Sequence, residues 1–258
     1  MHNNKYKVFN RDMMKYLALI PMFIGHMIAW INLMDHPDNS FALYELPTVL
    51  LVISGLALFC PPVMFFFIAD GYKYTRDRKK YALRLLIFAC ISQPFDWLIF
   101  QPIMGWRTTN VIFTLFFGLL SIIALESDLR LWKRVLLVIL CIGSTVLLRS
   151  DWMIFGVLFI LLLHIFRDRP KARFTTYSLL ILLHISMNLF SLGKVQTFKL
   201  ILYMFVTLAA FMAAYFCMTT FYNGKKGRHP NFAKWFFYGF FPAHYLIIYI
   251  VKILTDRY

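Results

Sequence analysis

The sequence predicts an all-α fold, a polytopic membrane bundle of about nine transmembrane helices, with eight to ten as the range. Of its 258 residues 60% are hydrophobic and only 15% are charged, whereas a soluble domain carries roughly a quarter charged residues. The apolar residues come in runs near the length of a bilayer crossing, roughly 17–25 residues for a helix. Because no loop between these runs is long enough to fold separately, we expect a single membrane domain over residues 1–258.

Nine apolar runs follow one another along the chain. They cover about residues 15–34, 47–69, 82–100, 110–125, 134–148, 152–166, 175–190, 198–221 and 234–253. The first run follows a basic start but lacks a cleavage site of small residues, so we expect a retained helix. The fifth to seventh runs are short, and we expect their hairpins to be tilted or partly interfacial.

Basic residues are concentrated in every second segment between the runs. With the N-terminus inside, these segments are cytoplasmic and hold most of the 27 Lys and Arg residues, which is the positive-inside pattern. The same bias accounts for most of the net charge of +15, so we do not expect nucleic acid as a partner. The four cysteines form no CxxC pair, and we expect no metal site.

Two histidines lie at matching depth inside the first and last runs. His26 follows Lys15 by 11 residues and His244 follows Lys234 by 10, and both lysines mark cytoplasmic helix ends. At about 1.5 Å per residue both imidazoles lie roughly 15 Å into the membrane. Ionisable groups at that depth are costly unless they face a cavity or a partner. If the two helices are neighbours, both rings can face one chamber as proton carriers. The alternative is a hydrogen bond to a neighbouring helix.

Other polar groups inside the runs have plainer explanations. His184 is a third candidate for which a hydrogen bond between helices is favoured, and His164 is given no role because it lies near the cytoplasmic interface. Asp96 lies near the outer face, where it either orients an acceptor or is an interfacial charge. The inner segment 69–84, ADGYKYTRDRKKYALR, suits a multiply phosphorylated ligand through its guanidinium and ammonium groups. The alternative is a basic loop that attracts anionic membrane lipid.

Several blocks of the sequence are similar to the TraX family. They are DGYKYTRDRKKYALRLLIFACISQPFD (70–96), NVIFTLFFGLL (110–120), SDWMIFGVLFIL (150–161) and FYNGKKG followed by FFYGFFPAHYLI (221–247). The likeness covers nearly the whole chain in the same order. The family is named for a conjugation protein that acetylates the N-terminus of pilin, and it resembles a branch of a wider transmembrane acyltransferase superfamily. Members of that superfamily transfer an acyl group from a cytoplasmic coenzyme A thioester.

The resemblance implies an N- or O-acyltransferase in the bacterial cytoplasmic membrane, with acetyl-CoA or another acyl-CoA as co-substrate and no metal. The acceptor would be a peptide N-terminus or a glycan hydroxyl at the cell surface. His244 and His26 would be the catalytic bases. The residues expected to hold the acyl-CoA are Lys15, Tyr74, Arg76, Lys79, Lys80, Arg84, Lys225 and Lys226. Those expected to serve the oxyanion or the acceptor are Asn110, Asp70 and Asp96.

Three positions depart from the family pattern. Gly25 stands where the family often has Asp, and Leu58 and Asp70 stand where it often has Arg and Glu. The missing Asp leaves His26 without its usual neighbouring charge and gives His244 more weight. Two other functions stay open: a proton-coupled transporter or channel using the same histidines, and a non-catalytic membrane assembly factor. Inverted repeats, which would favour a transporter, are not evident in the sequence.

Overall fold

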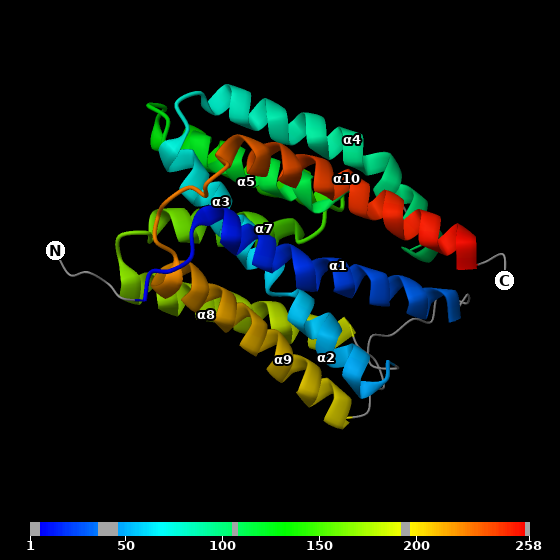
Figure 1. The fold of residues 1–258 in the computed structure, drawn as a ribbon. Helices are drawn as coiled ribbons and strands as arrows, with labels where there is room; N and C mark the ends of the chain where they lie inside the picture. The colour runs from blue at the N-terminus through cyan, green and yellow to red at the C-terminus, as the bar shows by residue number, and fades with distance from the viewer. Residues whose placement is uncertain (1–5, 36–45, 105–107, 192–196, 256–258) are drawn as a thin grey trace. The chain divides into compact units, whose positions relative to one another are not determined.

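Figure 1 shows the fold in the computed structural model of the chain, which describes residues 6–35, 46–104, 108–191 and 197–255. Ten α-helices follow one another along these residues, and no β-strand occurs among them, so the all-α prediction is confirmed. The helices are α1 (Arg11–Asp35), α2 (Thr48–Ala57), α3 (Cys60–Tyr74), α4 (Arg78–Met104), α5 (Val111–Leu125), α6 (Leu131–Leu147), α7 (Met153–Ile165), α8 (Pro170–Ser191), α9 (Thr197–Phe216) and α10 (Pro230–Thr255). A π-helical turn, Cys217–Phe221, continues α9.

The second apolar run forms two helices, α2 and α3, which meet at two prolines. Pro61 and Pro62 have no N–H to donate, so they interrupt a continuing helix but are tolerated in its first turn. They occupy the first turn of α3, and the Leu58 N–H before them donates to the Gly55 carbonyl at 3.1 Å. One predicted run therefore appears as a broken helix.

Four stretches of the described residues are long and apolar enough to cross a membrane, which confirms the polytopic bundle. They are Thr48–Tyr74, Arg78–Ile99, Phe198–Phe221 and Pro230–Thr255. The helices α5 and α7 are apolar but have only 15 and 13 residues. The seventh run lies inside a longer helix, α8, which has 22 residues because it begins at Pro170 in the polar segment before the run.

The helices belong to two compact units. Unit 1 contains residues 1–63 and 181–239, and unit 2 contains residues 64–180 and 240–258. The division falls inside α3, α8 and α10. The single domain expected over residues 1–258 stays a prediction.

In unit 1, α2 packs against both α1 and α9 (Figure 1). The contact of α1 with α2 needs a residue without a side chain at Gly25, because a Cβ there would clash with the Cβ of Ala57. This close approach leaves no room for a side chain at residue 25. A carboxylate at residue 25 would push the two helices apart.

In unit 2, α5 is central and packs against α4, α6 and α7. Aromatic rings join α3, α7 and α8: Phe65 stacks on Phe159 at 6.0 Å, and Phe159 meets Tyr177 edge-on at 5.3 Å. All three rings are buried. These buried rings hold α3, α7 and α8 against one another.

Candidate functional site

His244 is fully buried in unit 2 among aromatic rings of its own helix, α10. The Phe240 ring stacks on the imidazole at 5.4 Å, and the Tyr245 ring lies 4.1 Å from it, centroid to centroid. The Nδ1 atom lies 3.2 Å from the Phe240 carbonyl oxygen, which can only accept. Nδ1 therefore carries the proton, and in a neutral ring Nε2 holds the basic lone pair.

A buried carboxylate, Asp96 of α4, belongs to the same part of unit 2. It accepts hydrogen bonds from Gln93 Nε2 at 3.1 Å and from the Tyr245 hydroxyl. Asp96 is 2% exposed and Tyr245 is 1% exposed, so the pair is shielded from solvent. Because Tyr245 contacts both Asp96 and the His244 ring, it links the carboxylate to the imidazole.

Asn110 joins this cluster from the start of α5. Its Oδ1 accepts from the Ile112 N–H at 3.0 Å, which caps the helix. Its Nδ2 donates to the Ala89 carbonyl and to Gln93 Oε1, each at 2.9 Å. Both amide hydrogens are engaged, so the predicted role as an oxyanion donor requires one of these bonds to be released.

We call this cluster the His244 network: His244, Tyr245, Asp96, Gln93 and Asn110. The turn between α6 and α7 contacts Thr109, the residue before Asn110: Thr109 pairs with Ser150, and its carbonyl accepts from the Asp151 N–H at 2.9 Å. In this turn Trp152 adopts a left-handed conformation with φ of 66°, which is costly for a residue with a side chain. Such a conformation persists only where its surroundings hold it, and the strain lies next to the buried polar groups.

The predicted phosphate segment forms the turn from α3 to α4 and is largely exposed. Tyr74, Arg76, Lys79 and Lys80 are exposed, and Lys80 pairs with Asp77 at 3.4 Å. Arg84 is half-buried, and its guanidinium lies 5.8 Å from the Tyr81 ring. Asp70 is half-buried on α3 near this turn, whereas Asn110 begins α5. The turn thus presents separate cations to solvent.

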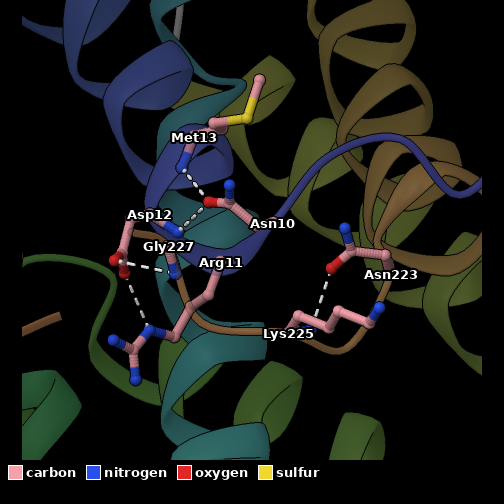
Figure 2. Close-up of polar contacts among 7 residues, drawn as sticks. All are labelled: Asn10, Arg11, Asp12, Met13, Asn223, Lys225 and Gly227. Carbon is pink, nitrogen blue, oxygen red and sulfur yellow. Dashed lines mark hydrogen bonds and ion pairs between the residues drawn. The ribbon is translucent and has the colours of Figure 1, made fainter. Parts of the chain in front are cut away.

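Further predicted residues lie in unit 1, where the start of α1 meets the loop before α10 (Figure 2). Asn10 caps α1 by accepting from the Asp12 and Met13 N–H groups, and Asp12 accepts from the Gly227 N–H at 3.1 Å. A Cβ at Gly227 would approach Asp12 to within 3.0 Å, so only glycine fits this loop position.

Lys15, Lys225 and Lys226 surround this junction. The Lys15 ammonium lies 5.2 Å above the Phe237 ring of α10. Lys225 and Lys226 are exposed, and the Lys225 backbone is held through Asn223 Oδ1 and the Arg11 N–H, both at 2.9 Å. The Y-N-G-K sequence of the family blocks therefore ties the loop to the start of α1.

His26 is half-buried on α1 in unit 1, whereas His244 belongs to unit 2. The chamber that the sequence predicts for both stays a prediction, as does a shared phosphate site for the lysines of the two units. No group of three metal-ligating side chains occurs in the part of the chain that the structure describes.

Three buried residues of unit 2 were missed by sequence reasoning: Gln93, Tyr245 and His164. Gln93 and Asp96 are three residues apart on one helix, which places them on one face, and that spacing could have identified Gln93. Tyr245 directly follows His244 but had no distinguishing signal. His164, given no role because of its interfacial position, is 4% exposed and bonds Glu126 Oε1 through Nε2 at 2.8 Å.

Comparison with known proteins gives two matches over nearly the full chain. A family model described as "TraX protein" matches residues 10–252. The probable fimbrial assembly protein FimC, serogroup H1, of Dichelobacter nodosus is 30% identical over 258 residues, which cover 96% of this chain and 98% of that protein. No solved structure matches the chain.

Proposed function

The chain belongs to the TraX family, and from this premise we propose that it is a membrane-embedded acyltransferase of the bacterial cytoplasmic membrane. It moves an acetyl or other acyl group from a coenzyme A thioester to an amine or hydroxyl acceptor. The relative is named as a fimbrial assembly protein, so a pilus-subunit N-terminus is the first acceptor to consider, followed by a glycan hydroxyl. The observation that carries the proposal is the buried His244 beside the Asp96–Tyr245 pair.

His244 acts as the base in this reaction. The Phe240 carbonyl fixes the Nδ1–H tautomer, so Nε2 accepts the proton of the acceptor amine or hydroxyl. As that proton leaves, the acceptor nitrogen or oxygen bonds to the thioester carbonyl carbon and the carbon–sulfur bond breaks. Nε2 then returns the proton to the departing sulfur, which leaves as the free thiol.

Tyr245 positions the imidazole, and Asp96 positions Tyr245. The Tyr245 ring packs on His244, and its hydroxyl is held by Asp96, so the ring plane of Tyr245 is fixed from two sides. Acyl-CoA supplies the activated acyl group, and basic residues at the predicted cytoplasmic face attract its phosphates.

A second candidate function is a non-catalytic membrane assembly factor. It is favoured by the relative, which is named as a probable fimbrial assembly protein, and by Gly25, where the resemblance leads us to expect an acidic neighbour of His26. Transport of protons by the same histidines is a third class, and it predicts flux without turnover.

One experiment separates these functions. Purified full-length protein in detergent is incubated with radiolabelled acetyl-CoA and a peptide carrying a pilin-type N-terminus. We expect release of free coenzyme A and labelled peptide, with the rate reduced in His244→Ala. Absence of coenzyme A binding and of thioester turnover by the wild type would contradict the acyltransferase, and a proton flux in vesicles would then favour transport.

A further inference from the structure

Three consecutive helices of unit 2 are shorter than the hydrocarbon core of a membrane. They are α5, α6 and α7, with 15, 17 and 13 residues. At about 1.5 Å per residue they extend about 20–26 Å, whereas that core is about 30 Å thick. Because each of the three packs against the other two, they form one packed group, which we call the short-helix group.

Polar contacts hold one end of the short-helix group in register. The Thr109 N–H and hydroxyl, just before α5, donate to the Arg149 and Leu148 carbonyls, just after α6, at 3.3 and 3.2 Å. The Asp151 N–H, just before α7, donates to the Thr109 carbonyl at 2.9 Å. The start of α5, the end of α6 and the start of α7 therefore lie at one level, which we call the Thr109 end.

Polar contacts hold the opposite end as well. Arg134 Nη1 of α6 donates to the Leu125 carbonyl of α5 at 3.0 Å, and His164 Nε2 of α7 lies 2.8 Å from Glu126 Oε1. Helices joined at both ends cannot slide past one another to cover a thicker bilayer, and tilting would reduce the height that they span. A span that is too short is accommodated by a thinner bilayer, by flanking side chains that reach the headgroups, or by association with another protein.

The neighbouring helix α4, with 27 residues, is long enough to cross the membrane. Its apolar span covers Arg78–Ile99. The Asn110 N–H and Nδ2 donate to Gln93 Oε1 at 3.0 and 2.9 Å, so the Thr109 end is level with Gln93. Since Gln93 precedes the last residue of the α4 span, the Thr109 end lies about 9 Å inside that span.

The opposite ends of α4 and α5 match each other. Arg78 begins α4, and Glu126 follows the last residue of α5. The pKa of Glu126 is lowered mainly by its hydrogen bond to His164 and also by the charge of Arg78, so Arg78 lies near this carboxylate. The difference in length between α4 and the short-helix group therefore falls at the Thr109 end.

The face of α6 that points away from α5 and α7 is suited to lipid chains. Among the 17 residues of α6 only Thr145 is buried. An exposed cation borders the helix near each end, Lys133 at its start and Arg149 just after it. Cations at such positions reach the headgroup phosphates of the two leaflets. The exposed aliphatic side chains between them are Val135, Leu136, Ile139, Leu140, Val146 and Leu147.

We propose that the short-helix group thins the bilayer on its side of unit 2, with lipid chains against the exposed face of α6. The membrane surface there lies at the level of Asn110, about 9 Å deeper than at Ile99 of α4. Gln93 and Asp96 of the His244 network lie at this same level, so a molecule from that side approaches them without crossing a full hydrocarbon layer. The thinning itself does not rest on the proposed function.

The test compares the membrane depth of two exposed sites that lie at one level of unit 2, Leu147 on α6 and Ile91 on α4. Each is replaced singly by p-acetylphenylalanine and coupled to a nitroxide, which leaves the native cysteines in place. The full chain is reconstituted in dioleoylphosphatidylcholine vesicles, and depth is measured by electron paramagnetic resonance from collisions with oxygen and with a water-soluble nickel chelate. We expect the label at Leu147 to lie about 9 Å shallower than the label at Ile91.

The matched control pair lies near the opposite end, where α4 and the short-helix group begin together. Leu83 is five residues after Arg78, and Ile139 is five residues after Arg134; both are exposed. Their labels should lie at equal depth. In dimyristoleoylphosphatidylcholine, which forms a thinner bilayer, the difference between Leu147 and Ile91 should narrow, and in dierucoylphosphatidylcholine it should widen. If a label at Ile91 disturbs folding, Ile87 on the same exposed stripe replaces it.

Equal depths at Leu147 and Ile91 overturn the proposal, because the bilayer would then be flat around unit 2. A difference of the same size and sign in the control pair overturns it too, since that result indicates a tilt of the whole unit. Labels at Leu147 and Ile139 that are shielded from oxygen show that protein, such as a second copy of the chain, covers α6 in place of lipid. Loss of acyl transfer alone leaves these depths unchanged, so failure of the proposed function is distinguishable from failure of this inference.

Discussion

His26 in unit 1 and His244 in unit 2 lie at matching depths by sequence but differ in their surroundings. His26 follows Gly25, whose contact with Ala57 leaves no room for a carboxylate beside the histidine. His244 contacts Tyr245, whose hydroxyl bonds to the buried Asp96. The buried acidic group of unit 2 thus comes from α4, a different helix from the one that carries His244. Equal depth in the membrane does not make two histidines chemically equivalent.

The largest expected effect concerns the two histidines themselves. His244→Ala should lower the rate of acyl transfer by about 10²–10⁴-fold, the range for loss of a general base, and His26→Ala should lower it less. The measurement is turnover of radiolabelled acetyl-CoA by both variants, with their thermal unfolding as a control for folding. His244→Gln, which keeps a polar group in the buried site, guards against a folding defect. An equal or greater loss in His26→Ala would contradict the assignment of the base to unit 2.

The second effect concerns the close contact between Gly25 and Ala57 in unit 1. Gly25→Ala should lower the free energy of unfolding by about 1–3 kcal/mol, because the new methyl overlaps Ala57. The matched control is Gly239→Ala in α10, where a Cβ meets no atom of the described residues within 4 Å. That change should be neutral or stabilise by about 0.5 kcal/mol through helix propensity. Equal unfolding midpoints for the two variants would show that α1 and α2 can separate at little cost.

The sequence predicts the helical class and most helices because apolar runs of bilayer length have few other structures. It does not predict the break between α2 and α3, although Pro61 and Pro62 mark the place. His164 shows what depth counting omits. A position near the interface indicates water, but the chain buries this ring against Glu126 through a contact 38 residues away in sequence. Such long-range contacts carry no periodic signal, and Tyr245 was missed for the same reason.

The third effect concerns the bond between Tyr245 and Asp96. Tyr245→Phe removes the hydroxyl that donates to Asp96 and leaves the donor from Gln93, which should cost about 1–2 kcal/mol of unfolding free energy. Tyr249→Phe, one turn later on α10 at a half-buried position, is the matched control and should change stability little. The comparison is made by denaturant or thermal unfolding in detergent. If both variants unfold alike, Asp96 does not depend on Tyr245, and the link from the carboxylate to His244 fails.

The smallest effect contrasts the partners of the two buried histidines of unit 2. The partner of His244 is a carbonyl that cannot titrate, whereas His164 bonds to Glu126. That hydrogen bond is the main reason the pKa of Glu126 lies below its ordinary value of about 4.3. A carboxylate whose folded pKa is lowered stabilises the fold above its ordinary pKa, and this contribution is lost as the pH falls through the lowered value.

Because Glu126 is nearly half exposed, the resulting pH dependence should be small but specific. Between about pH 5 and pH 3 the Tm of the wild type should fall more steeply than that of Glu126→Gln, which has no carboxylate to protonate. Asp128→Asn, two residues along at an exposed site, is the matched control and should keep the slope of the wild type. Identical slopes for all three proteins would mean that the His164–Glu126 bond adds no stability, and His164 would then be held by packing alone.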